Sequence, residues 1–211
     1  IIGVALAALT TAASREAGVG RSKILLRNNL SIAMRQLRDD IHNSSRVLYV
    51  RGRIDSASAG QNIPLLVLAQ NIDSNDEVIF DGTTPTYITY CFVTGSRSAL
   101  PSGAYSEGTI YRNVTNTLPS SLASQSCSGD VFLHNVKYIK PTGSSSDSKY
   151  YPVPLFRLSG TDSSYNYDST SAWKDLGSVL VVKLITERPS TPIVNDVVEE
   201  TFVLPNGFRV R

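Results

Sequence analysis

The chain opens with an uninterrupted apolar segment. Ile1–Ala13 contains no charged side chain, and it is followed at once by Ser14, Arg15 and Glu16. As a helix this segment would be about 20 Å long, and it has fewer residues than the ~20 that a helix needs to cross a bilayer. We therefore expect neither a complete membrane span nor a complete secretory signal, but the second half of an apolar helix that begins upstream.

An amphipathic helix is predicted directly after this segment. Its apolar positions recur at spacings of four, three, four and four, and we expect them to pack on the rest of the protein. Gly18 and Gly20 lie between the two parts, and each costs about 1 kcal/mol inside a helix, so we predict a weak or locally melted hinge there. The packing positions are Leu26, Leu30, Ala33, Leu37 and Ile41, with Ile24 and Met34 widening the stripe.

The remainder of the chain changes to a period of two. Stretches rich in Ser, Thr, Gly and Asp separate these runs and predict turns or loops. We therefore predict an α+β fold in which residues 1–45 form a helical stem laid on an antiparallel sheet, and residues 46–211 form a β-rich head. The predicted strands are 46–51, 63–69, 77–80, 86–93, 109–114, 131–139, 155–158, 178–186 and 197–204.

The net charge of +2 conceals an uneven distribution. Residues 1–53 carry nine Lys or Arg and three Asp or Glu, net +6, whereas residues 54–211 carry eleven and fifteen, net −4. Basic residues beside an apolar helix are typical of a membrane surface or of a contact with neighbouring subunits, so nucleic acid is not the expected partner. The basic side chains of the stem are Arg15, Arg21, Lys23, Arg27, Arg35 and Arg38.

The two cysteines, Cys91 and Cys127, are too few and too widely spaced for a zinc site. They are either two unrelated thiols or one disulfide. A composition poor in Cys and Met and rich in Ser, Thr and Asn, together with the apolar start, indicates an exported protein and favours the disulfide. Closing this long loop would stabilise the head by about 3–4 kcal/mol in the chain-entropy description.

Signals for catalysis are weak, and we do not expect an enzyme. His42 and His134 are the two histidines, and neither belongs to a nucleophile motif; a helix-end cation and a strand side chain are the favoured interpretations. No glycine-rich phosphate or dinucleotide fingerprint occurs. Paired carboxylates, as in glycosidases, are the one catalytic arrangement that the sequence leaves open.

Two loops carry candidate binding chemistry. Asp73, Asp76 and Glu77 could offer oxygen ligands to Ca²⁺, but the glycine and distal glutamate of a calcium loop are missing, so a solvated turn is favoured and no cofactor is expected. The aromatic-rich stretch 165–168, with Trp173 and Tyr150–Tyr151 nearby, could contact a sugar or a surface. Aromatic side chains in such loops more often cover a sheet edge.

Several segments together resemble the type IV pilin and pseudopilin family. Ile1–Ala13 is similar to the middle of the pilin N-terminal helix, which would place the family's assembly glutamate upstream, since position 5 is Ala5. Leu30–Ile41 followed by Ser45–Tyr49 resembles the stem of W-type minor pilins and of J-type pseudopilins of type II secretion. The runs 133–139, 179–185 and 200–207 resemble their strands more diffusely. The resemblance covers about half of the chain.

This resemblance implies a structural subunit of a pilus or pilus-like secretion filament. It implies anchoring in the inner membrane before assembly, and then a periplasmic or extracellular filament held together with other pilin or pseudopilin subunits. The expected assembly residues are Ile1, Ile2, Val4, Leu6 and Leu9. The large head favours a minor or tip subunit over a major one. The alternative of another class is a membrane-anchored surface module, an adhesin or a carbohydrate-binding domain, whose head loops bind a ligand.

Overall fold

The structure is a computed structural model. It describes residues 2–51, 60, 62–73, 77–80, 82–95, 105–139, 155–158, 166–168, 179–188 and 194–203, with side chains left aside at 2–6, 8, 105–106, 138–139 and 166–168. The linker-like stretch 141–149 and the aromatic positions Tyr150, Tyr151, Tyr165 and Trp173 lie outside the described residues.

One long helix, α1 (Ile2–Asn43), forms the stem. Its 42 residues span about 63 Å. The helix passes through Gly18 and Gly20 without a break, whereas a locally melted point was expected there. A cost of about 1 kcal/mol per glycine is small enough for the flanking turns to carry the helix through. No side chain of the described residues lies within 4 Å of where a Cβ would sit at either glycine.

The head is a single antiparallel sheet, so the α+β prediction is confirmed. Its order is β6-β8-β5-β4-β3-β2-β1-β7, with β9 pairing the other edge of β8. The strands are β1 (Arg46–Arg51), β2 (Asn62–Gln70), β3 (Thr86–Thr94), β4 (Tyr105–Thr115), β5 (Asp130–Ile139), β6 (Phe156–Leu158), β7 (Asn166–Asp168), β8 (Val179–Arg188) and β9 (Val194–Val203).

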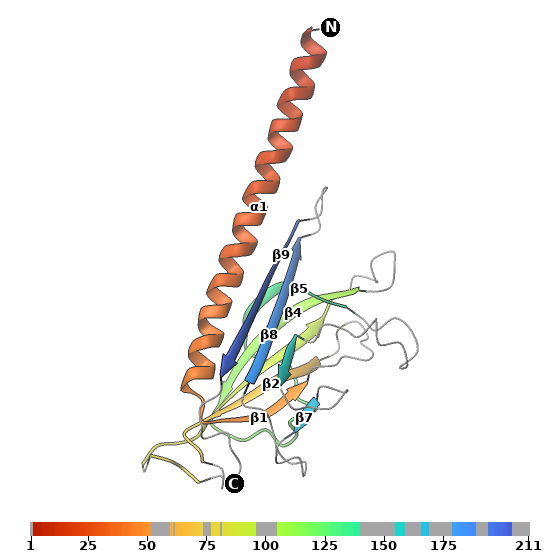
Figure 1. The fold of residues 1–211 in the computed structure, drawn as a ribbon. Coiled ribbons are helices and arrows are strands. Elements are labelled where there is room, and N and C mark those ends of the chain that lie inside the picture. Colours follow the sequence, from red (N-terminus) through yellow and green to blue (C-terminus); the bar gives the residue numbers. More distant parts are fainter. Residues whose placement is uncertain are drawn as a thin grey trace.

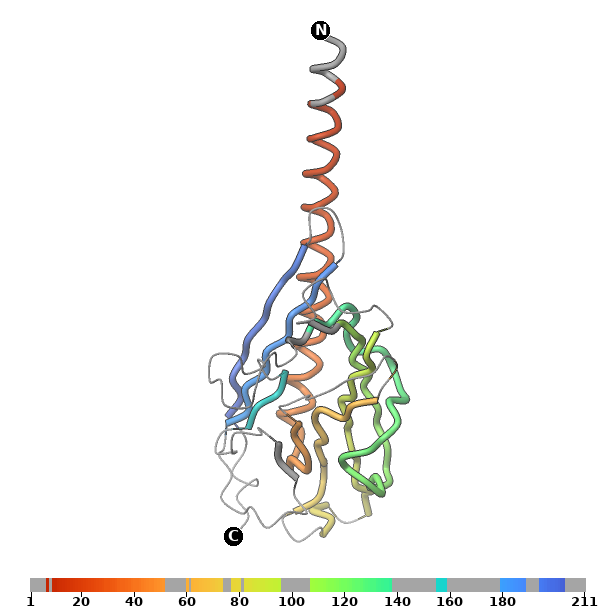
Figure 2. Tube along the Cα trace, turned by 90° about the vertical axis from the view of Figure 1, so that its right-hand side faces the viewer, coloured from red at the N-terminus to blue at the C-terminus, as the bar shows by residue number. Residues whose placement is uncertain are grey.

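The sheet curls around the second half of α1 and builds one main core. The helix contacts β9, β8, β5 and β2, and the curl brings β6 beside β1 (Figure 1). Tyr90 lies at the centre of this core, with its ring edge-on to Phe132 at 4.8 Å between centroids. The first half of the helix extends beyond the sheet as a free rod (Figure 2).

The other face of the sheet carries a smaller cluster. Its buried residues are Leu48, Tyr49, Val67, Ala69, Ile72, Tyr87 and Leu122. Leu122 comes from the connection between β4 and β5, and this connection therefore covers part of the outer face. The strand alternation explains the division, because Tyr87 and Ile88 point to opposite sides of β3 and enter different clusters.

Two strand predictions differ from the structure. Residues 77–80 were predicted as a strand, but only the isolated bridge between Ile72 and Val78 forms there. The cause is local, because Asn71 and Asp73 hold this segment in a compact loop through side-chain hydrogen bonds. Strand β7 was not predicted. It has three residues within a polar stretch, and its pairing with β1 is a long-range event.

Candidate functional site

The projecting half of α1 is the most unusual surface of the described molecule. Every side chain described from Leu9 to Gly18 is exposed, and Leu9 is 69% exposed. The first buried side chain along the helix is Leu26. About 25 residues, or roughly 37 Å, therefore lie ahead of the first buried contact with the sheet. Helices in proteins gain most of their stability from tertiary packing, and the described side chains of this half of α1 have none against the head.

Four of the five expected assembly residues, Ile2, Val4, Leu6 and Leu9, fall on this projecting half. Ile2, Val4 and Leu6 are described as helical backbone, and Ile1 lies outside the described residues. Leu9 is the one member with a described side chain, and nothing in the head covers it. The sequence and the backbone together place an apolar surface at the free end of the rod.

The second half of α1 meets the sheet through the stripe read from the sequence. Leu26, Leu30, Ala33, Leu37 and Ile41 are all buried, with Leu30 and Leu37 fully so, and Met34 joins them. Ile24 does not, because it is 62% exposed on the other side of the helix. The stem face away from the head also exposes Leu25 and Ile32, which the sequence reading overlooked. Their spacing from Ile24, at one and eight residues, was the available signal.

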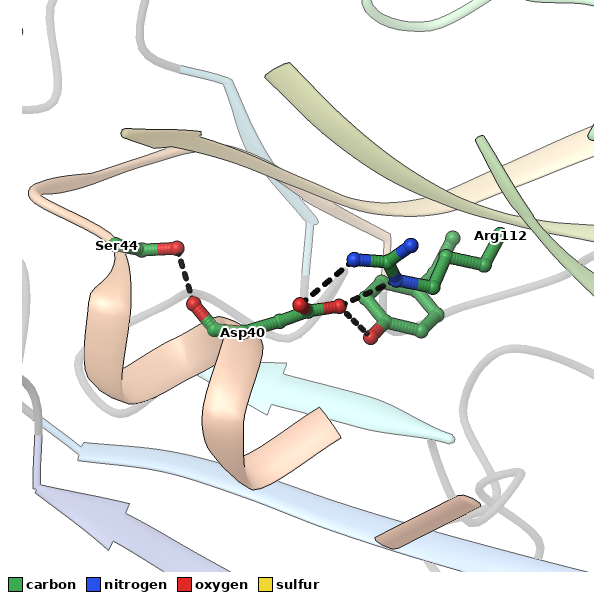
Figure 3. Close-up of polar contacts among 4 residues, drawn as sticks. Asp40, Ser44 and Arg112 are labelled. Carbon is green, nitrogen blue, oxygen red and sulfur yellow. Dashed lines mark hydrogen bonds and ion pairs between the residues drawn. The ribbon is translucent and has the colours of Figure 1, made fainter. Parts of the chain in front are cut away.

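A buried polar cluster fastens the end of the stem to the sheet. Asp40 accepts hydrogen bonds from Arg112 Nε at 2.6 Å and Nη2 at 2.8 Å, and from the Tyr90 hydroxyl at 2.5 Å (Figure 3). Tyr90 and Arg112 are directly opposed in β3 and β4, so both reach the same face of the sheet. The planar guanidinium of Arg112 forms the two-pronged geometry that suits a carboxylate.

The electrostatics of this cluster favour a charged pair beside a neutral phenol. Burial raises the pKa of Tyr90 far above its usual value, and the neighbouring Asp40 carboxylate raises it further. The hydrogen bonds to Asp40 raise the pKa of Arg112, which stays protonated. Tyr90 is therefore a hydrogen-bond donor to a fixed carboxylate. The arrangement holds α1 to β3 and β4.

Ion pairs of α1 with β9 lie nearer the surface. Arg38 donates to both carboxylate oxygens of Glu200, at 2.8 and 3.0 Å, and Arg27 lies 4.0 Å from Asp196. Exposed pairs of this kind contribute about 0–1 kcal/mol each. They fix the direction of the helix along β9 more than they stabilise the fold. Arg27 and Arg38, two of the basic residues of the stem, thus pair with the head of their own chain.

The disulfide between Cys91 and Cys127 is confirmed, with the two Cα atoms 5.3 Å apart. It ties the β4–β5 connection to the outer face of β3. The Thr89 hydroxyl donates to the Gln125 side chain at 3.1 Å beside it, and Leu122 is buried below. The bridge therefore secures a cover over the face of the sheet that the stem leaves open.

Asp73 and Glu77, two members of the weak calcium candidate, form a turn. Asp73 Oδ1 accepts the Glu77 backbone N–H at 2.9 Å, and the Glu77 carbonyl accepts the Asp73 N–H at 2.9 Å. Asp76 lies outside the described residues. Within the part of the chain that the structure describes, no three metal-ligating side chains gather at one place.

Neither of the two histidines takes part in the hydrogen bonds of the Asp40 cluster. His42 is exposed in the last turn of α1. His134 is exposed on β5, where its Nδ1 lies 3.3 Å from the Thr109 hydroxyl. Neither is placed beside a cysteine thiol, because both cysteines are bridged.

Among the described residues, none of the helical segments combines the length and apolar character needed to cross a bilayer. Comparison with known proteins found no matching family model, no matching curated protein and no matching solved structure.

Proposed function

We propose that the protein is a structural subunit of a type IV pilus or of a pilus-like secretion filament, with a pilin-like architecture. One observation carries the proposal: the first half of α1 projects from the head with its described side chains exposed. An apolar rod of this kind is unfavourable in water, and burying a fully exposed leucine is worth about 1.5–3 kcal/mol. Helices of neighbouring copies would supply that burial.

The division of α1 supports the same proposal. The second half packs on one side only, against its own sheet, through Leu26, Leu30 and Leu37. Residues 1–13, at the start of the rod, carry no charge on any side, as a helix surrounded by other subunits would. One helix thus combines a surface for its own head with a surface for its neighbours.

We propose a minor or tip position in the filament. The connections of the head include 16 residues between Ile139 and Phe156, a length that a densely packed repeating subunit would have to accommodate. Before assembly the apolar end of the chain would be held in the inner membrane, and afterwards the head would face the periplasm or the exterior. We also propose that the loops of the head bind a surface ligand.

The experiment compares the full chain with two variants of the rod. Purified protein is followed by sedimentation velocity at increasing concentration, and by negative-stain electron microscopy for filaments. Leu9→Lys places a charge in the assembly surface and should reduce the assembled fraction about tenfold or more. Ser14→Lys adds the same charge at an exposed polar position and should have a much smaller effect.

A full chain that stays monomeric at every concentration would contradict the proposal. The same holds if Leu9→Lys assembles as well as the parent. An anchored binding module would instead give a monomer that binds a surface glycan, so a glycan array run on the same sample separates that alternative class.

A further inference from the structure

The connection between β2 and β3 ends in an exposed apolar tip. Val78, Ile79 and Phe80 follow one another there, and Phe80 is 67% exposed. Three consecutive exposed apolar side chains are uncommon on the surface of a protein that acts alone. We call Glu77 together with these three residues the loop tip.

Hydrogen bonds fix the shape of this loop. Asn71 has a left-handed backbone with φ of 63°, and its side-chain oxygen accepts the Phe80 N–H at 3.0 Å while its carbonyl accepts the Ile79 N–H at 3.2 Å. Asp73 accepts the Glu77 N–H in the same loop. The apolar tip is therefore presented by a preformed scaffold, and binding would cost little ordering entropy.

The loop is fastened to the end of the stem. The Ser45 hydroxyl donates to the Ile72 carbonyl at 2.6 Å and accepts the Ile72 N–H at 3.2 Å. Since Ser45 follows directly after α1, the loop lies at the end of the molecule opposite to the free end of the rod, as Figure 1 shows. The protein thus carries two apolar surfaces at opposite ends.

A second exposed stripe runs along the face of α1 that points away from the head. Its apolar members are Ile24, Leu25 and Ile32, and Ile32 is 66% exposed. Arg21 and Arg35 lie on the same face at helical spacing, exposed and without a partner among the described residues. We call these five residues the outer stripe. Asp39, one turn beyond Arg35, ends it.

The two surfaces have complementary charge. The loop tip carries Glu77 with Asp73 in the same loop, and the outer stripe carries Arg21 and Arg35, whereas Arg27 and Arg38 pair with β9 of their own chain. Both surfaces also join apolar side chains to a charged border, which is the usual pattern of a protein–protein contact.

We propose that the loop tip of one copy docks on the outer stripe of a second copy. The contact joins two different patches, so it repeats from copy to copy and builds an open filament rather than a closed dimer. Ser45 lies 17 residues beyond the middle of the stripe, so parallel copies would be offset by about 25 Å along the helix. The inference rests on the proposed filament function and names the head-to-stem contact within it.

The direct test is cross-linking between full-length chains. Glu77→Cys in the loop tip and Asn28→Cys, an exposed position on the helix face of the outer stripe, are purified separately and keep the apolar side chains of both surfaces. Each variant has one free thiol because the native cysteines are bridged. A short bismaleimide should give covalent dimers when the two are mixed and several-fold fewer with either alone. Equal dimer yield from either variant alone would indicate a symmetric contact and would overturn the proposal.

Self-association measured by sedimentation separates this contact from the filament proposal. Phe80→Ser should weaken association about tenfold or more, whereas Leu118→Ser, an exposed leucine elsewhere on the head, should not. Glu77→Arg and Arg35→Glu should each weaken it, and the double variant should recover. Filaments that Phe80→Ser leaves intact would overturn this contact alone. If Phe80→Ser abolishes association and Leu9→Lys does not, the contact between loop tip and outer stripe is supported and the filament driven by the rod is contradicted. A chain that never associates would overturn both proposals.

Discussion

The carboxylate of Asp40 and the guanidinium of Arg112 meet in a two-pronged pair at 2.6 and 2.8 Å, although they lie 72 residues apart in the sequence. Asp40 comes from the last turns of the stem and Arg112 from the middle of β4. Tyr90 donates a third hydrogen bond to the same carboxylate. The orientation of the stem on the sheet is thus specified by a polar contact inside an otherwise apolar junction.

Replacing Arg112 should be costly. In Arg112→Met the buried carboxylate of Asp40 keeps only the hydrogen bond from the Tyr90 hydroxyl. Breaking a buried ion pair costs about 3–5 kcal/mol. We expect a loss near the lower end, because Arg112 keeps a fifth of its side-chain surface in solvent. Urea unfolding measures this loss. Arg35→Met, at an exposed position of the same stem, should change stability by less than about 0.5 kcal/mol. A similar effect of both variants would refute the role of the pair.

The raised pKa of Tyr90 predicts that the stability of the fold depends on pH in the alkaline range. Its pKa is raised in the folded protein, so above about pH 10 the unfolded chain loses the phenol proton while the folded chain retains it. The contribution of Tyr90 is complete below that pH, and the free energy of unfolding then falls by up to about 1.4 kcal/mol per pH unit.

Tyr90→Phe is the matched variant, because it removes the titrating proton and keeps the ring against Phe132. At pH 8 it should be about 1 kcal/mol less stable than the parent, and the gap should narrow at pH 11. Denaturant curves of both proteins at the two pH values measure the gap. A difference in stability that is constant or that widens would contradict the raised pKa of Tyr90 in the folded protein.

The stem stripe predicts a sharp contrast between two helix positions. Leu37 is fully buried, and Leu37→Ala should cost about 2–5 kcal/mol through lost burial and a cavity. Ile32 is 66% exposed, and Ile32→Ala should cost less than about 0.5 kcal/mol in the monomer. Thermal unfolding of the two variants checks the orientation of α1. A reversed order would mean that the helix is rotated on the sheet.

Loss of the disulfide should weaken the head without removing a helix contact. The bridge spans 36 residues, and the chain-entropy description gives about 3–4 kcal/mol for a loop of that size. The double variant Cys91→Ala, Cys127→Ala should show this loss by urea unfolding, and the parent under reducing conditions should match it. Unchanged stability in both samples would mean that the bridge constrains nothing.

The sequence was sufficient for features that repeat along the chain. The helical spacing of Leu26, Leu30 and Leu37 predicted both the stem and its buried face, and the strand period predicted most of the sheet. The outer stripe was not predicted because Ile24 and Leu25 directly precede Leu26 of the buried stripe, and Ile24 was assigned to that stripe.

Features made by contact between distant segments could not be predicted. Nothing near Asp40 in the sequence points to Arg112, and only the register of β3 and β4 puts Arg112 beside Tyr90. Val78–Phe80 has the composition of a strand. Asn71 prevents a strand there, because its left-handed backbone turns the chain, its side-chain oxygen accepts the Phe80 N–H and its carbonyl accepts the Ile79 N–H.

The lengthwise course of α1 along β8 and β9 also sets how the molecule would carry a mechanical load. The buried apolar contacts of the helix with the sheet are spread from Leu26 to Ile41, about 22 Å of its length. A pull on the free end of the rod is directed along these contacts, so they are strained together in shear and not opened one after another. The Asp40–Arg112 pair lies near the far end of this seam and would share the load with the apolar contacts. Such a joint resists tension along the rod better than a sideways pull that peels the helix from its free end.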